Sequence, residues 1–180
     1  MRIICTGAQG TGKTTLMNNL ASREEFKNFT KIDSISRSIQ KDENVDLGGG
    51  TNTTSSYQSK IFDKYYQALS QDNIISDRSL VDVCAYTDNL DKSNIDNIIE
   101  LLRELKQCIK YEEEYKDNTL YVYLPIEFEV SDDGVRCVDE EYQRSVDSSI
   151  KYFLHMTDIP VLRVTGSVEE RTQQVIDYLI

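Results

Sequence analysis

The sequence has 180 residues, of which 39% are hydrophobic and 28% charged, and it carries a formal net charge of −11. This length suits a single domain with a sizeable core. The acidity argues against a duplex DNA or RNA partner, because such binding depends on Lys and Arg side chains that displace counterions from phosphates, whereas a small anionic ligand can still be held by backbone amides.

The first half of the chain predicts three short strands separated by helices. The β-branched run Arg2–Thr6 stops at Gly7 and predicts a buried strand. Thr30–Ile32 and Asn73–Ser76 predict the second and third strands. The segments between them carry apolar side chains at helical spacing, namely Leu16, Met17 and Leu20 in the first and Tyr57, Ile61, Phe62, Tyr65, Tyr66 and Leu69 in the second.

The second half continues the alternation. Ser93–Asp96 predicts a capping box that opens a long helix, with one apolar face formed by Ile95, Ile98, Ile99, Leu102, Leu105 and Ile109. Leu120–Leu124 predicts a strand that Pro125 ends, and Ser145–Leu154 predicts a helix. The last elements are a strand over Val161–Val164 and a helix opened by a capping box at Ser167–Glu170.

Strands therefore alternate with helices five times, which predicts an α/β domain over residues 1–180 with a parallel sheet and helices on both faces. The stretch Leu47–Ser56 contains three glycines followed by Thr, Asn and Ser. We interpret it as a connecting loop, with ordering by a substrate as the alternative.

A phosphate-binding motif follows the first predicted strand. Gly7–Thr14 matches G-x-x-x-x-G-K-[ST] in full, in the required strand–loop–helix context. Successive N–H groups of such a loop converge on phosphates at the positive end of the next helix. Lys13 would reach the β- and γ-phosphates of ATP, and the Thr14 hydroxyl would bind Mg²⁺. The predicted nucleotide-binding residues are Gly7, Gln9, Gly10, Thr11, Gly12, Lys13, Thr14 and Thr15.

Other motifs narrow the class of P-loop protein. The D-x-x-G and [NT]-K-x-D strings of a switch GTPase both occur, at Asp46–Gly49 and Thr30–Asp33, but in reversed order, so we interpret them as coincidence. A motor-type ATPase usually has Asp-Glu after an apolar strand. Here Ile74–Ser76 is followed by Asp77 and Arg78, which favours a kinase.

Asp77 and Arg78 are candidate catalytic and substrate-binding residues. In the predicted topology they end the third strand beside the P-loop, where ligands bind. A carboxylate there can order magnesium waters or accept a hydroxyl proton, which makes Thr14 and Asp77 the predicted metal residues, and an adjacent Arg can neutralise charge on the transferred group. The alternative is a surface ion pair.

A lid segment is predicted at about residues 126–145. The polar turn Ser131–Arg136 follows the fourth strand, and Arg144 lies on the next predicted helix. Arg136 and Arg144 are candidates to close over the γ-phosphate and exclude water. The alternative is that they balance the acidic residues 139–141 in i,i+3 or i,i+4 pairs.

The remaining chemistry-bearing residue types are sparse. The four cysteines are too scattered for a zinc site, and His155 is the single histidine, which excludes His-based metal or triad chemistry. No apolar run approaches a membrane span, and the first residues lack a signal-peptide core. We expect a cytoplasmic protein with no membrane partner, and nothing in the sequence specifies an oligomeric state.

Three features of the chain resemble the small NadR-type P-loop kinases, which are related to nicotinamide riboside kinases and distantly to thymidylate and deoxynucleoside kinases. They are the P-loop, the segment Asp77-Arg78-Ser79 followed by Asp82, and Asp133–Arg136 in a segment after a proline. Compact versions are common in tailed phages, which would place this protein in a host cytoplasm. The resemblance implies a three-layer sandwich with strand order 2-3-1-4-5, an ATP lid, and Thr165–Ser167 near the adenine.

The resemblance also implies that Ser36 and Arg37 help to bind the phosphate acceptor. Related kinases often carry an acidic residue after the second strand, where this chain has Asp33 followed by Ser34–Ser36. That departure leaves the identity of the acceptor open.

The sequence therefore predicts ATP- and Mg²⁺-dependent phosphoryl transfer to a nucleoside, a nucleoside monophosphate or a related riboside, with Arg37, Asp77 and Arg78 at the acceptor. One alternative is a nucleotide-binding or hydrolysing regulator that acts through a protein partner, which the acidic surface also suits. A kinase of polynucleotide ends is a third option, against which the lack of a basic stripe argues.

Overall fold

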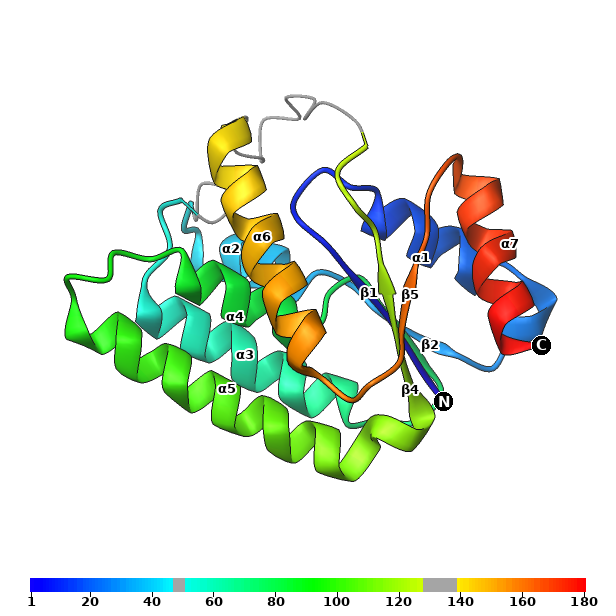
Figure 1. Ribbon diagram of the computed structural model, residues 1–180, viewed down its shortest axis with the longest axis horizontal. Coiled ribbons are helices and arrows are strands. Elements are labelled where there is room, and N and C mark those ends of the chain that lie inside the picture. The colour runs from blue at the N-terminus through cyan, green and yellow to red at the C-terminus, as the bar shows by residue number, and fades with distance from the viewer. Residues whose placement is uncertain (47–50, 128–138) are drawn as a thin grey trace.

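The computed structural model describes residues 1–46, 51–127 and 139–180. Within these ranges the chain forms one five-stranded sheet in which all strands are parallel, in the order β2-β3-β1-β4-β5 (Figure 1). Both the α/β class and the expected order 2-3-1-4-5 are confirmed. The strands are β1 Arg2–Thr6, β2 Thr30–Ile32, β3 Ile74–Ser76, β4 Thr119–Tyr123 and β5 Val161–Arg163.

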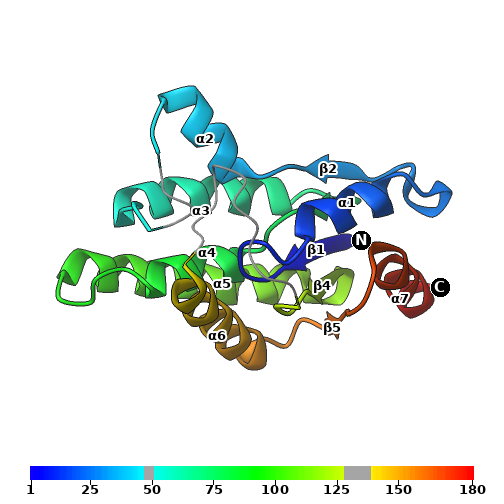
Figure 2. The ribbon, with the colours of Figure 1, turned by 90° about the horizontal axis from the view of Figure 1, so that it is seen from above.

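Helices cover both faces of the sheet. Figure 2 shows α1 and α7 on one side, with α3, α4, α5 and α6 on the other and α2 at the edge nearest β2. The helices are α1 Lys13–Ala21, α2 Ile35–Glu43, α3 Ser55–Leu69, α4 Leu80–Asp88, α5 Ile95–Tyr115, α6 Glu140–Met156 and α7 Val168–Leu179, and the short 3-10 turns are η1 Glu24–Phe26 and η3 Lys116–Asn118.

Successive side chains along each strand alternate between two separate hydrophobic cores, one on each face of the sheet. Ile3 and Cys5 of β1 pack with Leu16 and Leu20 of α1 on one face. Ile4, between them in sequence, packs on the other face among the helices α3, α4 and α6. Because successive strand residues point to opposite faces, a strand buried on both sides reads as an unbroken apolar run.

Parallel pairing brings the functional segments to one edge of the sheet. Ile4 of β1 lies beside Ser76 of β3, so the P-loop and the Asp77-Arg78-Ser79 segment both leave the carboxyl ends of neighbouring strands. Ligands of open parallel sheets bind at this edge. The hydroxyls of Ser79 and Thr6 lie 3.1 Å apart across it.

Two helices and one cap differ from the sequence expectations. The helices α2 and α4 had not been identified from periodicity. Eight of the nine residues of α4 are buried, and a helix buried all round shows no amphipathic pattern. The helix α5 starts at Ile95 with Asn94 as its cap, so the predicted capping box at Ser93–Asp96 is wrong, whereas the box at Ser167–Glu170 is confirmed.

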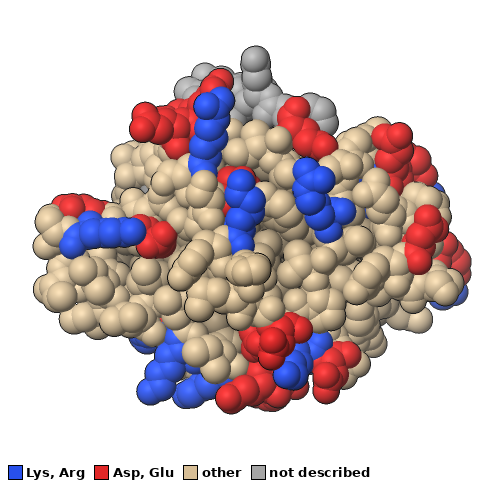
Figure 3. Space-filling model, in the orientation of Figure 1, with Lys and Arg blue, Asp and Glu red and all other residues tan. Residues whose placement is uncertain are grey.

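The apolar face of α5 points away from the protein. Five of its side chains are between 37% and 62% exposed: Ile95, Ile98, Ile99, Leu102 and Ile109. Over the N-terminal part of α5, at the lower left of Figure 3, most of the visible surface is uncharged. Among the described residues, no helix combines the length and the apolar character needed to cross a membrane.

Candidate active site

The P-loop adopts a backbone path that requires glycine at two points. Gly7 lies so close to β4 that an added Cβ would sit 2.5 Å from the carbonyl oxygen of Leu124. Gly12 has a φ of 92° and precedes the first turn of α1, where no side chain caps the helix. The first N–H groups of α1 are thus left without a side-chain acceptor, which is the arrangement that binds phosphate at a helix N-terminus.

Lys13 lies within the loop and is 6% exposed. Its ammonium group donates to the carbonyl oxygens of Gly7 and Ala8, both at 2.6 Å. Burial, and next the positive charge of Arg78, lowers the pKa of Lys13 to about 8. A cation held at this position, at the mouth of a helix N-terminus, complements a polyphosphate.

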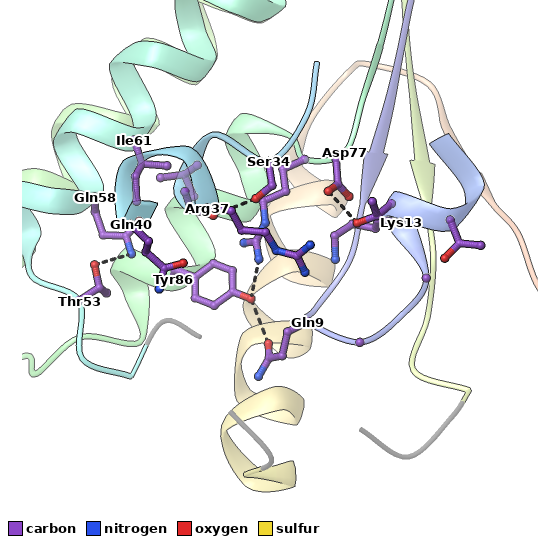
Figure 4. Close-up of a pocket in the computed structure, with 17 residues that line it drawn as sticks. Gln9, Lys13, Ser34, Arg37, Gln40, Thr53, Gln58, Ile61, Asp77 and Tyr86 are labelled. Carbon is purple, nitrogen blue, oxygen red and sulfur yellow. Dashed lines mark hydrogen bonds between the residues drawn. The ribbon is translucent and has the colours of Figure 1, made fainter. Parts of the chain in front are cut away.

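The two predicted metal residues contact each other. The hydroxyl of Thr14, in the first turn of α1, donates to Oδ2 of Asp77 at 2.8 Å (Figure 4). Asp77 is 4% exposed, and its backbone N–H continues the sheet by donating to the carbonyl of Ile32 at 3.1 Å. A hydroxyl and a carboxylate are the oxygen donors that Mg²⁺ uses when phosphates and water complete its shell, so this pair fits that ion.

A buried carboxylate joins the P-loop to α4. Asp82 is fully buried and accepts from the backbone N–H of Gly7 at 2.9 Å through one oxygen. Its other oxygen accepts from the N–H and the hydroxyl of Ser79, at 2.7 and 2.5 Å. The Ser79–Asp82 capping box that starts α4 therefore also fixes the start of the P-loop, a role that the sequence pattern alone did not reveal.

Two residues from the C-terminal third also hold the loop. Arg171 of α7 is 3% exposed and donates to the carbonyl of Thr11 at 2.8 Å and to Glu127 at 2.5 Å. Gln143 of α6 donates to the carbonyl of Gln9 at 2.6 Å. Neither belongs to a motif, because their contacts with the P-loop join positions more than 130 residues apart.

A cavity of about 240 Å³ opens beside the P-loop. Arg78 lies in it with its guanidinium carbon 4.7 Å from the centre of the Tyr86 ring. The Tyr86 hydroxyl accepts from Arg78 at 3.4 Å and donates to Oε1 of Gln9 at 3.0 Å. This chain of contacts joins the predicted Asp-Arg segment to the P-loop, and Tyr86 was not identified from the sequence.

The opposite wall of the cavity comes from α2 and the start of α3. Figure 4 shows Arg37 and Lys13 pointing into the same space from opposite sides. Around Arg37 the wall consists of small polar and amide side chains, contributed by Ser34, Ser36, Gln40, Thr53 and Gln58, with Ile61 and Val83 as its apolar part. Asp33, by contrast, is exposed and lies 3.7 Å from Lys31.

Of the two predicted lid arginines, the structure describes only Arg144. Arg136 and the rest of the turn Ser131–Arg136 lie outside the described residues. Arg144 is on α6 in an exposed ion pair with Glu140 at 3.0 Å and does not line the cavity, so the geometry matches the alternative interpretation of Arg144. Its role in closure stays a prediction.

The loop after β5 reaches the P-loop indirectly. Glu127 accepts from the N–H of Gly166 at 3.1 Å as well as from Arg171, and Arg171 bonds to the loop. The segment Thr165–Ser167, expected near an adenine, is therefore linked to Thr11 through two intervening residues, Glu127 and Arg171.

The parallel sheet and the phosphate loop define a P-loop nucleotide-binding domain. A family model described as an AAA domain matches residues 2–171, and the chain belongs to that family. No curated protein matches the sequence.

Solved structures share the fold at low sequence identity. A NadR protein in complex with NR superposes with a TM-score of 0.76 at 20% identity, over 99% of this chain and 50% of that one; this chain thus spans about half the length of that NadR protein. Deoxyadenosine kinase from M. mycoides, with products dCMP and dCDP, gives 0.63 at 17% identity, over 99% and 98%. Thymidylate kinase from Ehrlichia chaffeensis gives 0.62 at 15%, over 100% and 98%.

Proposed function

We propose that the protein is an ATP- and Mg²⁺-dependent kinase that phosphorylates a nucleoside, a nucleoside monophosphate or a related riboside. The observation that carries the proposal is the convergence of Lys13, the Thr14–Asp77 pair and Arg78 on one cavity. The fold is shared with a deoxyadenosine kinase and a thymidylate kinase, which supports the same class of reaction by analogy.

Each residue has a defined part in this chemistry. The amides of Gly7–Thr14 and the Lys13 ammonium would hold the triphosphate, and Thr14 with Asp77 would hold Mg²⁺. When bound, that ion neutralises charge on the phosphate oxygens. Arg78 is held on the Tyr86 ring, so its guanidinium is positioned to neutralise charge on the transferred group without reorganisation during the reaction.

The acceptor would occupy the space between the P-loop and α2. The cavity continues from Lys13 to Ser34, Arg37 and Gln40, which supports a position for a second substrate opposite the phosphates. Such positioning of two reactants is the main catalytic contribution in phosphoryl transfer.

The test is incubation of the protein with ATP, Mg²⁺ and a panel of nucleosides, ribosides and monophosphates, with product separated by chromatography. We expect phosphoryl transfer to at least one acceptor. ATP binding without transfer to any acceptor would favour the regulator that acts through a protein partner.

Asp77→Asn provides the matched measurement. The amide keeps the shape of the side chain and removes the charge that binds the metal, so we expect kcat to fall by about 100-fold or more, while the protein stays folded. Asp72→Asn is the control, because Asp72 lies on an exposed turn with its carboxylate paired to Arg2. Equal activity of Asp77→Asn and Asp72→Asn would contradict the assignment of Asp77.

A further inference from the structure

Charge is distributed unevenly between the cavity and the rest of the protein. The whole chain carries −11, yet the described residues that line the cavity include three cations, Lys13, Arg37 and Arg78, and one carboxylate, Asp77. Asp77 already accepts from Thr14. The acceptor half of the cavity thus holds two guanidinium groups and no carboxylate of its own among the described residues.

Neither guanidinium has a carboxylate partner within the described part of the chain. The guanidinium of Arg78 makes one hydrogen bond there, of 3.4 Å, to the Tyr86 hydroxyl. No ion pair of Arg37 or Arg78 occurs among those residues. Most other arginines of the described chain are paired, such as Arg103 with Glu100 and Asp63. Arg78 is a partly buried cation, and such a cation without a counter-ion favours an anionic ligand; Arg37 is exposed and lines the same cavity.

An anionic acceptor and a neutral acceptor differ in whether the reaction needs a general base. A nucleoside hydroxyl must lose a proton to attack phosphorus, and this calls for a nearby base. Asp33, the acidic residue that follows β2, is exposed and near Lys31 and does not line the cavity. Asp77, the one carboxylate among the described lining residues, accepts from Thr14 and is assigned to Mg²⁺ in the proposed function rather than to the acceptor hydroxyl. A phosphate monoester, whose second pKa is about 6, is already ionised at neutral pH and needs no base.

From these observations we infer that the acceptor is a phosphate monoester, such as a nucleoside monophosphate, whose phosphate lies between Arg37 and Arg78. This inference rests on the proposed kinase function. An oxygen of the acceptor phosphate forms a bond to the γ-phosphorus of ATP, and the bond from that phosphorus to the bridging β-phosphate oxygen breaks. The products are a diphosphate and ADP, and no proton leaves the acceptor. The amide side chains of Gln40 and Gln58 would face the rest of the acceptor.

The experiment compares each monophosphate with its parent nucleoside at equal concentrations of ATP and Mg²⁺. We expect kcat/KM for the best monophosphate to exceed that for its nucleoside by at least 100-fold. Arg37→Gln and Arg78→Gln should each raise the KM for the monophosphate by tenfold or more, and Arg37→Gln should leave the Kd for ATP unchanged within threefold. Lys41→Gln is the matched control, because Lys41 is an exposed cation on the same helix, outside the cavity.

The possible outcomes separate the two proposals. Efficient transfer to a nucleoside, equal to or better than transfer to its monophosphate, overturns the inference and leaves the kinase in place. Transfer to neither class overturns both. An Arg37→Gln effect no larger than that of Lys41→Gln overturns the assignment of the phosphate position.

The exposed face of α5 carries a second, independent inference. Its five apolar side chains are between 37% and 62% exposed, and a contiguous exposed apolar patch of this kind is often functional. Ile95, Ile99, Leu102, Lys106 and Ile109 follow one another at steps of four and three residues, the spacing of a helix that packs lengthwise against another helix.

The charges that flank this stripe are self-complementary. Asp96 and Lys110 lie at opposite ends, both are exposed, and they are separated by two heptads, so they lie on the same flank. If two copies of α5 cross antiparallel near Leu102, Asp96 of each lies near Lys110 of the other, and Ile95 lies near Ile109. We propose that two copies of the chain associate through this face of α5.

The test is the mass of the full chain in solution across micromolar concentrations. We expect a dimer that Leu102→Glu converts to a monomer, while Tyr178→Glu, a matched change at an exposed apolar residue of α7, does not. Asp96→Lys should weaken the dimer, and combining it with Lys110→Asp should restore it. A monomer at all concentrations, a dimer unaffected by Leu102→Glu, or association only with a different protein would each overturn the proposal.

Discussion

The two halves of the cavity are held in different ways. On the phosphate side, the backbone of the P-loop is fixed by hydrogen bonds from distant elements, through Asp82, Gln143 and Arg171. On the acceptor side, α2 buries one side chain, Ile39, and Arg37 is exposed. The difference indicates that the P-loop side, which binds the phosphate donor, is rigid, whereas the α2 side, which selects the acceptor, is held by few contacts.

The largest effect is expected from removing the ammonium group of Lys13, the cation of the phosphate side. Lys13→Ala should lower the affinity for ATP by about 100-fold or more, because the ammonium bond to phosphate is charge-assisted and buried, while acceptor affinity changes little. Calorimetry with the Mg²⁺ nucleotide provides the measurement. Lys27→Ala, at an exposed lysine paired with Glu24, is the control and should bind as the unmodified protein does.

The next largest effect is expected at the carboxylate beneath the loop. Asp82→Asn replaces an acceptor that receives three hydrogen bonds with a group that is half donor, so the free energy of unfolding should fall by about 2–3 kcal/mol. Urea denaturation measures it. The same change at Asp42, exposed on α2, should cost less than about 0.5 kcal/mol. Equal losses of unfolding free energy in Asp82→Asn and Asp42→Asn would contradict the difference between the phosphate side and the acceptor side of the cavity.

The pH dependence should also belong to the phosphate side alone. The pKa of Lys13 is lowered to about 8, so the ammonium is largely present below pH 8 and is lost above it. Because the charged form binds phosphate, ATP affinity should fall by about tenfold between pH 7 and pH 9. Arginines stay charged over this range, so acceptor affinity should be flat. An ATP affinity that rises with pH would contradict this sign.

The smallest change is expected on the acceptor wall. Gln40→Ala removes one neutral hydrogen-bonding group from the cavity, which corresponds to about 1 kcal/mol or roughly fivefold in the KM for the acceptor. The KM for ATP should be unaffected. Gln67→Ala, an exposed position on α3, is the control for steady-state kinetics, and a shift in the KM for ATP instead would place Gln40 with the nucleotide.

The sequence was most informative where chemistry is local. The P-loop was predicted from eight consecutive residues, because phosphate binding by backbone amides needs glycine and lysine at fixed spacing. The five strands were predicted for a similar reason, since each is a short apolar run. Resemblance to a known kinase family, rather than any pattern within the chain, supplied the strand order.

Contacts between distant positions were not predictable in this way. Arg171 and Gln143 meet the P-loop only after the chain has folded, and nothing in their neighbouring residues marks them. Tyr86 lies on α4, whose burial on all sides removed the helical signal. The direction of the α5 stripe was also hidden, because periodicity shows that apolar residues share a face and does not show what that face meets.

Gln143 and Arg144 are neighbours on α6, and consecutive residues of a helix project about 100° apart. While Gln143 holds the carbonyl of Gln9, Arg144 is directed outward to Glu140. Bringing Arg144 to a phosphate would mean turning the helix and releasing that carbonyl. The helix α6 can therefore direct only one of these two side chains to the P-loop at a time. Either the amide of Gln143 stabilises the loop, or the cation of Arg144 reaches the phosphates.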